Sequence, residues 1–371
     1  MRKSFMKKTA AVAAACVISL GALAPVKAEA SVFGDVLGSV IGGVAAMNEI
    51  NSQVTKLDNE GRNDFYNQMR EKYGVNDNYD ANAQLERIMT RLSAVIVKYD
   101  PTIKEKPYNY FVNNDTSFNA FCTLGHNISV NRGLFDTLNF QEDEVAFVIG
   151  HELAHGTHKD PANGVKKQVG VQVLASIVAS SAGGSVLTNL GVGVMANLGT
   201  AKGVTLPMEK RADADAFTYC SEAGYNVGAG AAVWQRIIEL TGKNNKSTSS
   251  INQLFNPSDH PKHVNRRDTY IKTMNTYSNK MVNVDSKTGM ISVNKVAIGV
   301  PAAAFGQSQL ERTYFVAGDI ADVYHRNGGT RVRAYASNGH VYLGNKPVLT
   351  VTNGDDANSW VANLNKANGL K

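Results

Sequence analysis

The sequence predicts an α+β fold that is mainly helical, contains one small sheet and ends in a small β-rich domain. Three observations support this prediction. Long segments before residue 280 have apolar residues at helical spacing, two short β-type segments interrupt them at 108–112 and 128–130, and strand-like alternation dominates after residue 280. We therefore expect residues 31–283 to form one domain and residues 284–371 a second.

The composition is that of a globular protein with an export signal. The 371 residues, 43% of them hydrophobic, are enough for one large core and a smaller second one. Residues 1–30 combine a basic start, an apolar stretch and the small-residue cleavage site Ala28-Glu29-Ala30. Their removal takes away five basic residues and one acidic residue, which leaves 33 of the 38 Lys and Arg residues and 31 of the 32 Asp and Glu residues. The mature chain is nearly neutral, so we expect no nucleic-acid partner.

The export signal predicts a location outside the cytoplasm. The periplasm is our expectation, and secretion or attachment to the outer membrane are the alternatives. Two cysteines remain in the mature chain, Cys122 and Cys220. They can pair in an oxidising compartment, and the sequence leaves both the free and the paired state open.

The first elements of the larger domain are a helix and two strands. Apolar spacing predicts a helix from Asp80 that Asp100-Pro101 closes. The segments 108–112 and 128–130 have the composition of short strands, and Asn113-Asn114-Asp115 is a turn signal after the first. These strands directly precede a strongly helical part of the chain, so we expect a small sheet beside packed helices.

A buried helix is predicted around the apolar run at 145–150. Asn139 can cap it, which puts Glu142 at its third position and further acidic residues near the positive end of the helix dipole. The helix should end near Gly156, ahead of Lys159-Asp160-Pro161.

This helix carries the segment His151-Glu-Leu-Ala-His155. Residues four apart share one helix face, so both imidazoles can bind one tetrahedral ion, for which zinc is the best match. Glu152 lies beside the metal without binding it and can take a proton from the attacking water. This is the HExxH arrangement of a metallopeptidase. Buried polar groups need a partner, and a metal provides one.

The segment 169–201 has no charged residue, which raises the question of a membrane span. Its many Gly, Ser, Asn and Gln residues dilute its hydrophobicity. We therefore favour a helical hairpin that packs on the protein core or makes a peripheral contact with a membrane surface.

A catalytic zinc site needs a third protein ligand. A histidine six residues beyond His155 is excluded, because Pro161 stands there. A helix is predicted to run from Pro207 to about Gly224, with Glu209 and Asp213 on one face. Glu209 would bind the metal, and Asp213 would accept a hydrogen bond from a ligand histidine. Such a pair alone is usually a solvated helix face, so its meaning depends on the HExxH helix.

A further histidine, His260, lies ahead of Pro261 in a segment that ends at Arg266. The reaction develops negative charge on the attacked carbonyl oxygen, and a histidine or arginine nearby can stabilise it. The alternative is an ordinary loop histidine before a helix that Pro261 begins.

The C-terminal region has a different pattern. Residues 290–300, 313–317, 331–336 and 340–343 alternate as strands do, and Asn338-Gly339 predicts a two-residue hairpin. No fixed-period repeat is evident. We expect a small β-rich domain, whose role and partner the sequence leaves open.

Several motifs share the order and spacing of a known family: Asn119-Ala-Phe121, Gly125-His-Asn-Ile, Asn131-Arg-Gly-Leu134, the HExxH segment, Glu209 to Asp213, His260-Pro261 and Arg266. Over about residues 100–270 the chain resembles the zinc endopeptidases typified by HtpX and the CAAX prenyl protease, which are of the gluzincin type. Within that family it resembles the soluble exported branch.

The resemblance implies a zincin-like metalloprotease domain with one zinc ion and assigns roles in it. Three residues would bind zinc: His151, His155 and Glu209. Glu152 would be the general base, and His260 would be the transition-state or gating histidine. Asp213 and Arg266 would support the site. Three residues would form the edge strand along which a polypeptide substrate lies: Asn119, Ala120 and Phe121. The exported branch includes periplasmic proteases of misfolded outer-membrane proteins, so unfolded envelope proteins are the expected substrates.

The chain departs from its membrane-embedded relatives, which have several clear spans, so we do not expect prenylated substrates or cleavage within the membrane. Two other hypotheses stay open. The protein can be an exported chaperone or assembly factor whose zinc site is latent, with His260 in the open coordination position. Alternatively, the C-terminal region is the main functional module and binds the cell envelope or a partner.

Overall fold

The computed structural model describes residues 52, 54–56, 58–168, 205–243 and 262–370. Three expectations fall outside these residues: the export signal at 1–30, the hairpin at 169–201 and the position of His260. Helices dominate the described part and small sheets accompany them, so the predicted α+β class is confirmed. None of the described helices is both long and apolar enough to cross a membrane.

Two helices open the described part of the chain, α4 (Arg62–Tyr73) and α5 (Tyr79–Ile96). α5 begins where the Asn78 side chain accepts a hydrogen bond from the Ala81 N–H, and its apolar face is buried. The predicted helix from Asp80 is therefore confirmed. The 3-10 helix η1 (Pro101–Lys104) follows at the predicted stop.

Three short strands form a sheet in the order β1-β3-β2: β1 (Asn109–Asn113), β2 (Ala120–Thr123) and β3 (Asn127–Asn131). β1 runs parallel to β3, and β2 runs antiparallel to it. The turn η2 (Leu124–His126) joins β2 to β3 through Gly125, whose positive φ of 75° favours glycine. The predicted strands at 108–112 and 128–130 are confirmed, and β2 lies at an edge of the sheet formed by the described residues.

The helices α6 (Arg132–Thr137), α7 (Glu142–Thr157) and α8 (Asp160–Gln168) follow. The HExxH helix is α7, which ends one residue beyond the predicted Gly156. The prediction that Asn139 caps this helix is wrong. Asn139 and Phe140 have positive φ angles of 48° and 54°, so the chain turns there and Gln141 takes the N-cap position without a side-chain hydrogen bond.

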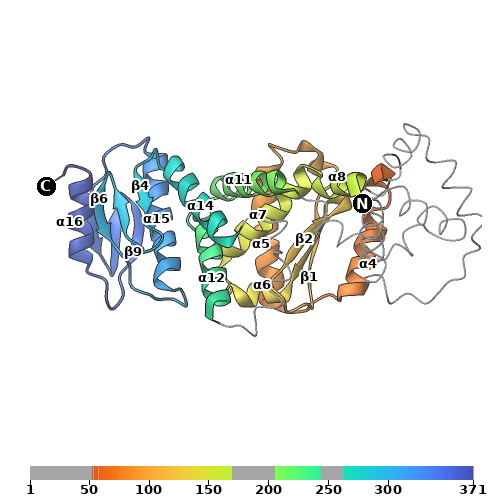
Figure 1. The fold of residues 1–371 in the computed structure, drawn as a ribbon, viewed down its shortest axis with the longest axis horizontal. Helices are drawn as coiled ribbons and strands as arrows, with labels where there is room; N and C mark the ends of the chain where they lie inside the picture. Colours follow the sequence, from red (N-terminus) through yellow and green to blue (C-terminus); the bar gives the residue numbers. More distant parts are fainter. Residues whose placement is uncertain (1–51, 53, 57, 169–204, 244–261, 371) are drawn as a thin grey trace, which may run out of the picture. The chain divides into compact units, whose positions relative to one another are not determined.

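Three further helices complete this part of the fold: α11 (Leu206–Glu222), α12 (Ala229–Lys243) and α14 (His263–Tyr277). α11 is the helix predicted from Pro207, and Gly224, with a φ of +79°, follows its end. α7 and α11 lie side by side (Figure 1), and Cys220 Sγ of α11 comes so close to Gly150 of α7 that a side chain at this position would crowd it.

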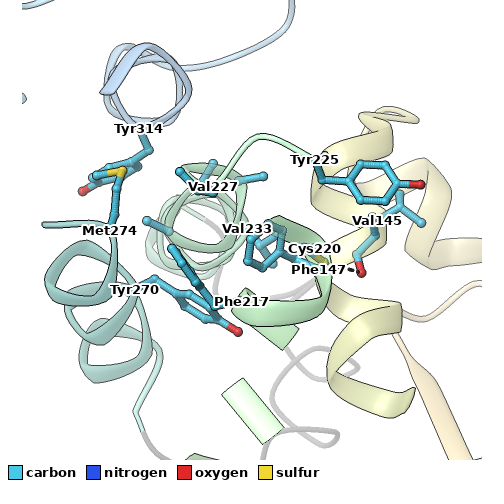
Figure 2. Close-up of a cluster of buried hydrophobic side chains, with 14 of the residues drawn as sticks. Val145, Phe147, Phe217, Cys220, Tyr225, Val227, Val233, Tyr270, Met274 and Tyr314 are labelled. Atoms are coloured by element: carbon cyan, nitrogen blue, oxygen red, sulfur yellow. Dashed lines mark hydrogen bonds between the residues drawn. The ribbon is translucent and has the colours of Figure 1, made fainter. Parts of the chain in front are cut away.

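A single buried cluster joins these helices (Figure 2). It combines aromatic and aliphatic residues from α7, α11, α12, α14 and a later helix, α15 (Gln309–Arg326): Phe147, Phe217, Val233, Tyr270 and Tyr314. Burial of side chains of this size contributes about 1.5–3 kcal/mol each to folding, so the cluster holds the helices that carry the candidate site in a fixed arrangement.

The two cysteines of the mature chain are free and buried. Cys122 on β2 approaches α7 at Gly156, whereas Cys220 on α11 approaches it at Gly150. Six residues of helix correspond to about 9 Å, which separates the two contacts. The thiols therefore pack at different places on α7, and the open question of a disulfide is answered against pairing.

The C-terminal region contains six strands and two helices: β4 (Val282–Val284), β5 (Ile291–Val293), β6 (Val296–Gly299), α15 (Gln309–Arg326), β7 (Ala334–Ser337), β8 (His340–Leu343), β9 (Lys346–Thr350) and α16 (Ala357–Ala367). The strands lie between α15 and α16 (Figure 1). A division into domains at residue 283 stays a prediction.

Some of the local predictions for this region are confirmed and others are wrong. The strand at 340–343 is confirmed, and Asn338-Gly339 forms the predicted turn with φ angles of 48° and 76°. The segment 290–300 is a hairpin, and the strand predicted at 313–317 lies inside α15. α15 starts with a capping box in which Ser308 and Glu311 satisfy each other's backbone N–H groups.

The two halves of this region repeat one topology. In each half the middle strand pairs antiparallel with both neighbours, and β-bulges occur at Ile291/Ser292 and at Val341/Tyr342. α15 contacts β4 and β9, while α16 contacts β7 and β6, so each helix packs on both halves. Segments 291–299 and 341–349 have no identical residue at equivalent positions, which explains why the sequence shows no repeat.

Candidate metal centre

The two motif histidines lie on the same face of α7 and point to a common position. His151 and His155 are 8% and 5% exposed, and their Nε2 atoms are 3.1 Å apart. Both side chains are therefore buried in a helix that packs on α11 and α12.

Glu209 approaches this pair from the first turn of α11. Its Oε1 lies 3.4 Å from His155 Nε2, and its Oε2 lies 3.5 Å from His151 Nε2. In a tetrahedral zinc site with bonds of about 2.0–2.1 Å, neighbouring ligand atoms are roughly 3.3 Å apart. The three separations are close to that edge length, and a different oxygen of Glu209 faces each histidine, so the three residues form a group that could hold a divalent cation.

Each histidine has its own carboxylate at Nδ1. Asp213 Oδ1 lies 3.1 Å from His151 Nδ1, and Arg266 Nη2 lies at the same distance from that nitrogen. Asp160 Oδ2 lies 2.9 Å from His155 Nδ1, a contact that the sequence analysis missed. When Nδ1–H donates to a carboxylate, the lone pair of Nε2 is left for a metal.

The charges around the histidines favour a cation at this position. Burial lowers the pKa of His155, but the hydrogen bonds to Asp160 and Glu209 and the charge of Glu152 raise it, with a net result of about 10. The pKa of His151 is also raised, because Asp213 and Glu209 outweigh burial and the charge of Arg266. A metal ion bound here would take the place of these protons, since a ligand histidine binds in its neutral form.

Glu152 connects α7 to the edge strand β2. Its Oε2 accepts a hydrogen bond of 3.1 Å from the Cys122 N–H. The Asn131 N–H donates to the Asn119 carbonyl, so Asn119 faces β3. Successive residues of a strand direct their N–H and C=O groups to opposite sides, so Ala120 and Cys122 direct theirs away from β3. The N–H and C=O of Ala120 therefore point to the same side as the Cys122 N–H that Glu152 binds.

An apolar pocket adjoins the candidate site. Its walls include aromatic and aliphatic side chains: Phe118, Phe147, Val148, Val233 and Trp234. His151 and Glu152 also face it, as do Asn119 and Ala120 at the start of β2. The expected edge strand and the expected reacting groups thus border one cavity, and Phe121 continues the strand beyond it.

Arg266 on α14 lies next to the candidate site and contacts Asp213 and His151. It is 3% exposed and pairs with Asp213, with 2.9 Å between Arg266 Nε and Asp213 Oδ2. Burial raises the pKa of Asp213, but Arg266 and His151 lower it by more than burial raises it, so the pKa is below its ordinary value. The guanidinium also stacks on Trp234, with 3.8 Å from Cζ to the ring centre. Arg266 thus contacts both Asp213 and Trp234, and its role as a supporting residue stays a prediction.

A family model for peptidase family M48 matches residues 80–272, just over half of the chain. The chain belongs to peptidase family M48. A comparison with curated proteins gives no match. This M48 member is a metallopeptidase, and the match runs from α5 through most of α14. It stops before β4, so the C-terminal region lies outside the matched part of the chain.

Loss of Glu209 is expected to weaken zinc binding by the M48 member more than the roughly 10–100-fold loss typical of an outer-shell partner. The measurement is competition with a chromogenic chelator on the purified Glu209→Ala variant, with elemental analysis after dialysis. Asp215→Ala is the matched control, because Asp215 is on the same helix but pairs with the half-buried His158. Equal zinc affinities of Glu209→Ala and the parent protein would remove Glu209 from the ligand set.

Proposed function

We propose that this M48 metallopeptidase is an exported zinc-dependent endopeptidase that hydrolyses unfolded or misfolded envelope proteins. The observation that carries the proposal is the convergence of His151, His155 and Glu209 beside a carboxylate that contacts an edge strand. The residues at 1–30 support export by their basic start, apolar stretch and cleavage site.

The edge strand β2 supports an extended polypeptide as the substrate. Ala120 directs an N–H and a C=O to the open side of the strand, and Cys122 directs a C=O there. A peptide that pairs with these groups is held mainly by backbone hydrogen bonds, which depend little on its sequence. Such binding requires an extended chain, so it favours unfolded proteins over folded ones.

Glu152 is proposed as the residue that moves the proton during hydrolysis. It lies next to His151 in the sequence and faces the pocket that β2 borders. It would take a proton from the attacking water and pass it to the amine that leaves. When bound by His151, His155 and Glu209, zinc supplies Lewis-acid activation of the water and of the scissile carbonyl.

Two residues keep the ligands in place during this reaction. Asp213 would hold the ring of His151 through Nδ1, and Arg266 would hold Asp213. His260 is proposed as the residue that stabilises the oxyanion or gates the site, on the basis of its sequence motif alone.

The deciding experiment is hydrolysis of casein by the purified mature chain, with added zinc and with a chelator. We expect cleavage within the chain that the chelator stops and zinc restores. A protein that binds zinc and suppresses aggregation of unfolded proteins, yet cleaves none of them, would support the latent chaperone instead.

Replacement of Ala120 by proline is expected to lower kcat/KM for casein by roughly tenfold. The variant loses one well-formed hydrogen bond to the substrate, which costs about 1.4 kcal/mol, and this free energy corresponds to a factor of about ten. Proline removes an N–H that β3 does not use, so the sheet should persist. Ala120→Ser keeps the N–H and is the control. The two variants should have similar melting temperatures, and equal kcat/KM values would argue against strand addition at β2.

A further inference from the structure

The beginning of α8 returns the chain to the metal centre. α7 ends at Thr157, and Lys159 has a positive φ of 54° before α8 starts at Asp160. The Lys159 N–H donates to the Gly156 carbonyl at 2.9 Å, which closes this turn. The turn places Asp160 beside the face of α7 that carries His155, and only 1% of Asp160 is exposed.

The two carboxylate oxygens of Asp160 have different partners. Oδ2 lies 2.9 Å from His155 Nδ1, and Oδ1 accepts a hydrogen bond from Arg211 Nη2. Arg211 is on α11, two residues after Glu209. Asp160 therefore links the second histidine to the helix that supplies the glutamate.

The first histidine has a corresponding arrangement. His151 Nδ1 contacts Asp213, and Arg266 holds Asp213 from α14. Each histidine thus has a carboxylate at Nδ1, and each carboxylate has an arginine from a different helix. Asp213 belongs to the predicted motif, whereas the sequence assigns Asp160 only to the end of the HExxH helix.

We infer that Asp160 is a positioning residue for His155 and sets the metal affinity of the centre. By accepting Nδ1–H, it fixes the tautomer that leaves Nε2 free for the ion and raises the basicity of the imidazole. The hydrogen bond from Arg211 to Asp160 ties the Asp160–His155 contact to α11, the helix that also carries Glu209. The inference rests on the proposed zinc function, because it assigns Asp160 a role toward that ion.

The test is the zinc affinity of Asp160→Ala and Asp160→Asn, measured by chelator competition on the mature protein. We expect Asp160→Ala to lose about 10–100-fold in affinity, and Asp160→Asn to lose less because its carbonyl can still accept from Nδ1–H. Denaturant unfolding of the metal-free forms shows whether each variant folds. If Asp160→Ala fails to fold, the asparagine variant carries the test.

The ligand field gives a readout that a purely structural role would not change. With Co²⁺ in place of zinc, the visible absorption of Asp160→Ala should shift relative to the parent protein, because the His155 imidazole is turned and less basic. Asp215→Ala removes the contact between α11 and His158, which lies in the turn between α7 and α8, and should leave both spectrum and affinity unchanged.

The outcomes separate this inference from the proposed function. A parent protein that binds neither zinc nor Co²⁺ overturns the proposed function and, with it, the role of Asp160. A parent that binds zinc, together with folded Asp160 variants of unchanged affinity and spectrum, overturns the role of Asp160 alone.

Discussion

Replacement of Glu152 by glutamine is expected to lower peptide hydrolysis by at least 10²–10⁴-fold, the contribution usual for a positioned general base, while zinc remains bound. Glutamine keeps the size of the side chain and an oxygen that can accept from the Cys122 N–H, but it cannot take a proton. The measurements are initial rates on casein and zinc content of the same sample.

The control is Glu142→Gln on the same helix. Glu142 is in the first turn of α7 and pairs with Arg87 at the surface, so its loss should leave both rate and zinc content unchanged. Hydrolysis by Glu152→Gln at the parent rate would remove Glu152 from the role of base. Loss of zinc from this variant would mean that Glu152 also supports the metal.

Replacement of Arg266 by methionine is expected to destabilise the fold by roughly 3–5 kcal/mol, which is the usual cost of removing one partner of a buried ion pair while the other keeps its charge. Asp213 would keep its charge in a buried position, and its remaining side-chain partners among the described residues would be the Tyr270 hydroxyl and His151. The stacking on Trp234 would also be lost. Denaturant unfolding at constant zinc concentration measures the change.

The effect should depend on pH in a defined direction. In the parent protein the pKa of Asp213 is below its ordinary value of 3.8, so its stabilising contribution is present above that pH and lost as the pH falls through the folded pKa. Without Arg266 burial should raise the pKa of Asp213, so the variant should become relatively more stable toward low pH.

A second variant identifies the cause. Arg267→Met, one residue along α14, breaks a pair with the more exposed Asp268 and a hydrogen bond to Gln235, and should cost about 1–2 kcal/mol. If Arg266→Met costs no more than Arg267→Met, the buried pair does not hold α14 on the site. Combination with Asp213→Leu should restore part of the lost stability, because the unpaired charge is then absent.

The HExxH helix and the later carboxylate pair could be predicted because their information is local. The four-residue spacings 151–155 and 209–213 place side chains on one helix face whatever surrounds them. The turn at Asn338-Gly339 is also local, since both residues tolerate the positive φ that a two-residue hairpin requires.

Other predictions were wrong because tertiary contacts outweigh local preference. The segment 313–317 contains β-favouring residues, but it lies in an 18-residue helix whose residues are buried on several sides. α15 has apolar residues at helical spacing over its full length and packs on β4, β9 and α12, and this outweighs the β preference of the five residues inside it. Asn139 is a good helix cap by type, yet the left-handed turn at Asn139-Phe140 delays the start of α7.

The sequence by itself determined the identity and spacing of two histidines and a glutamate, and hence the metallopeptidase chemistry of the chain. Only the tertiary structure decided what surrounds them: Asp160 at His155, Arg266 behind Asp213, and Glu152 at the edge of β2. Spacing along one helix is fixed by backbone geometry, whereas contacts between helices and strands depend on packing of the whole core.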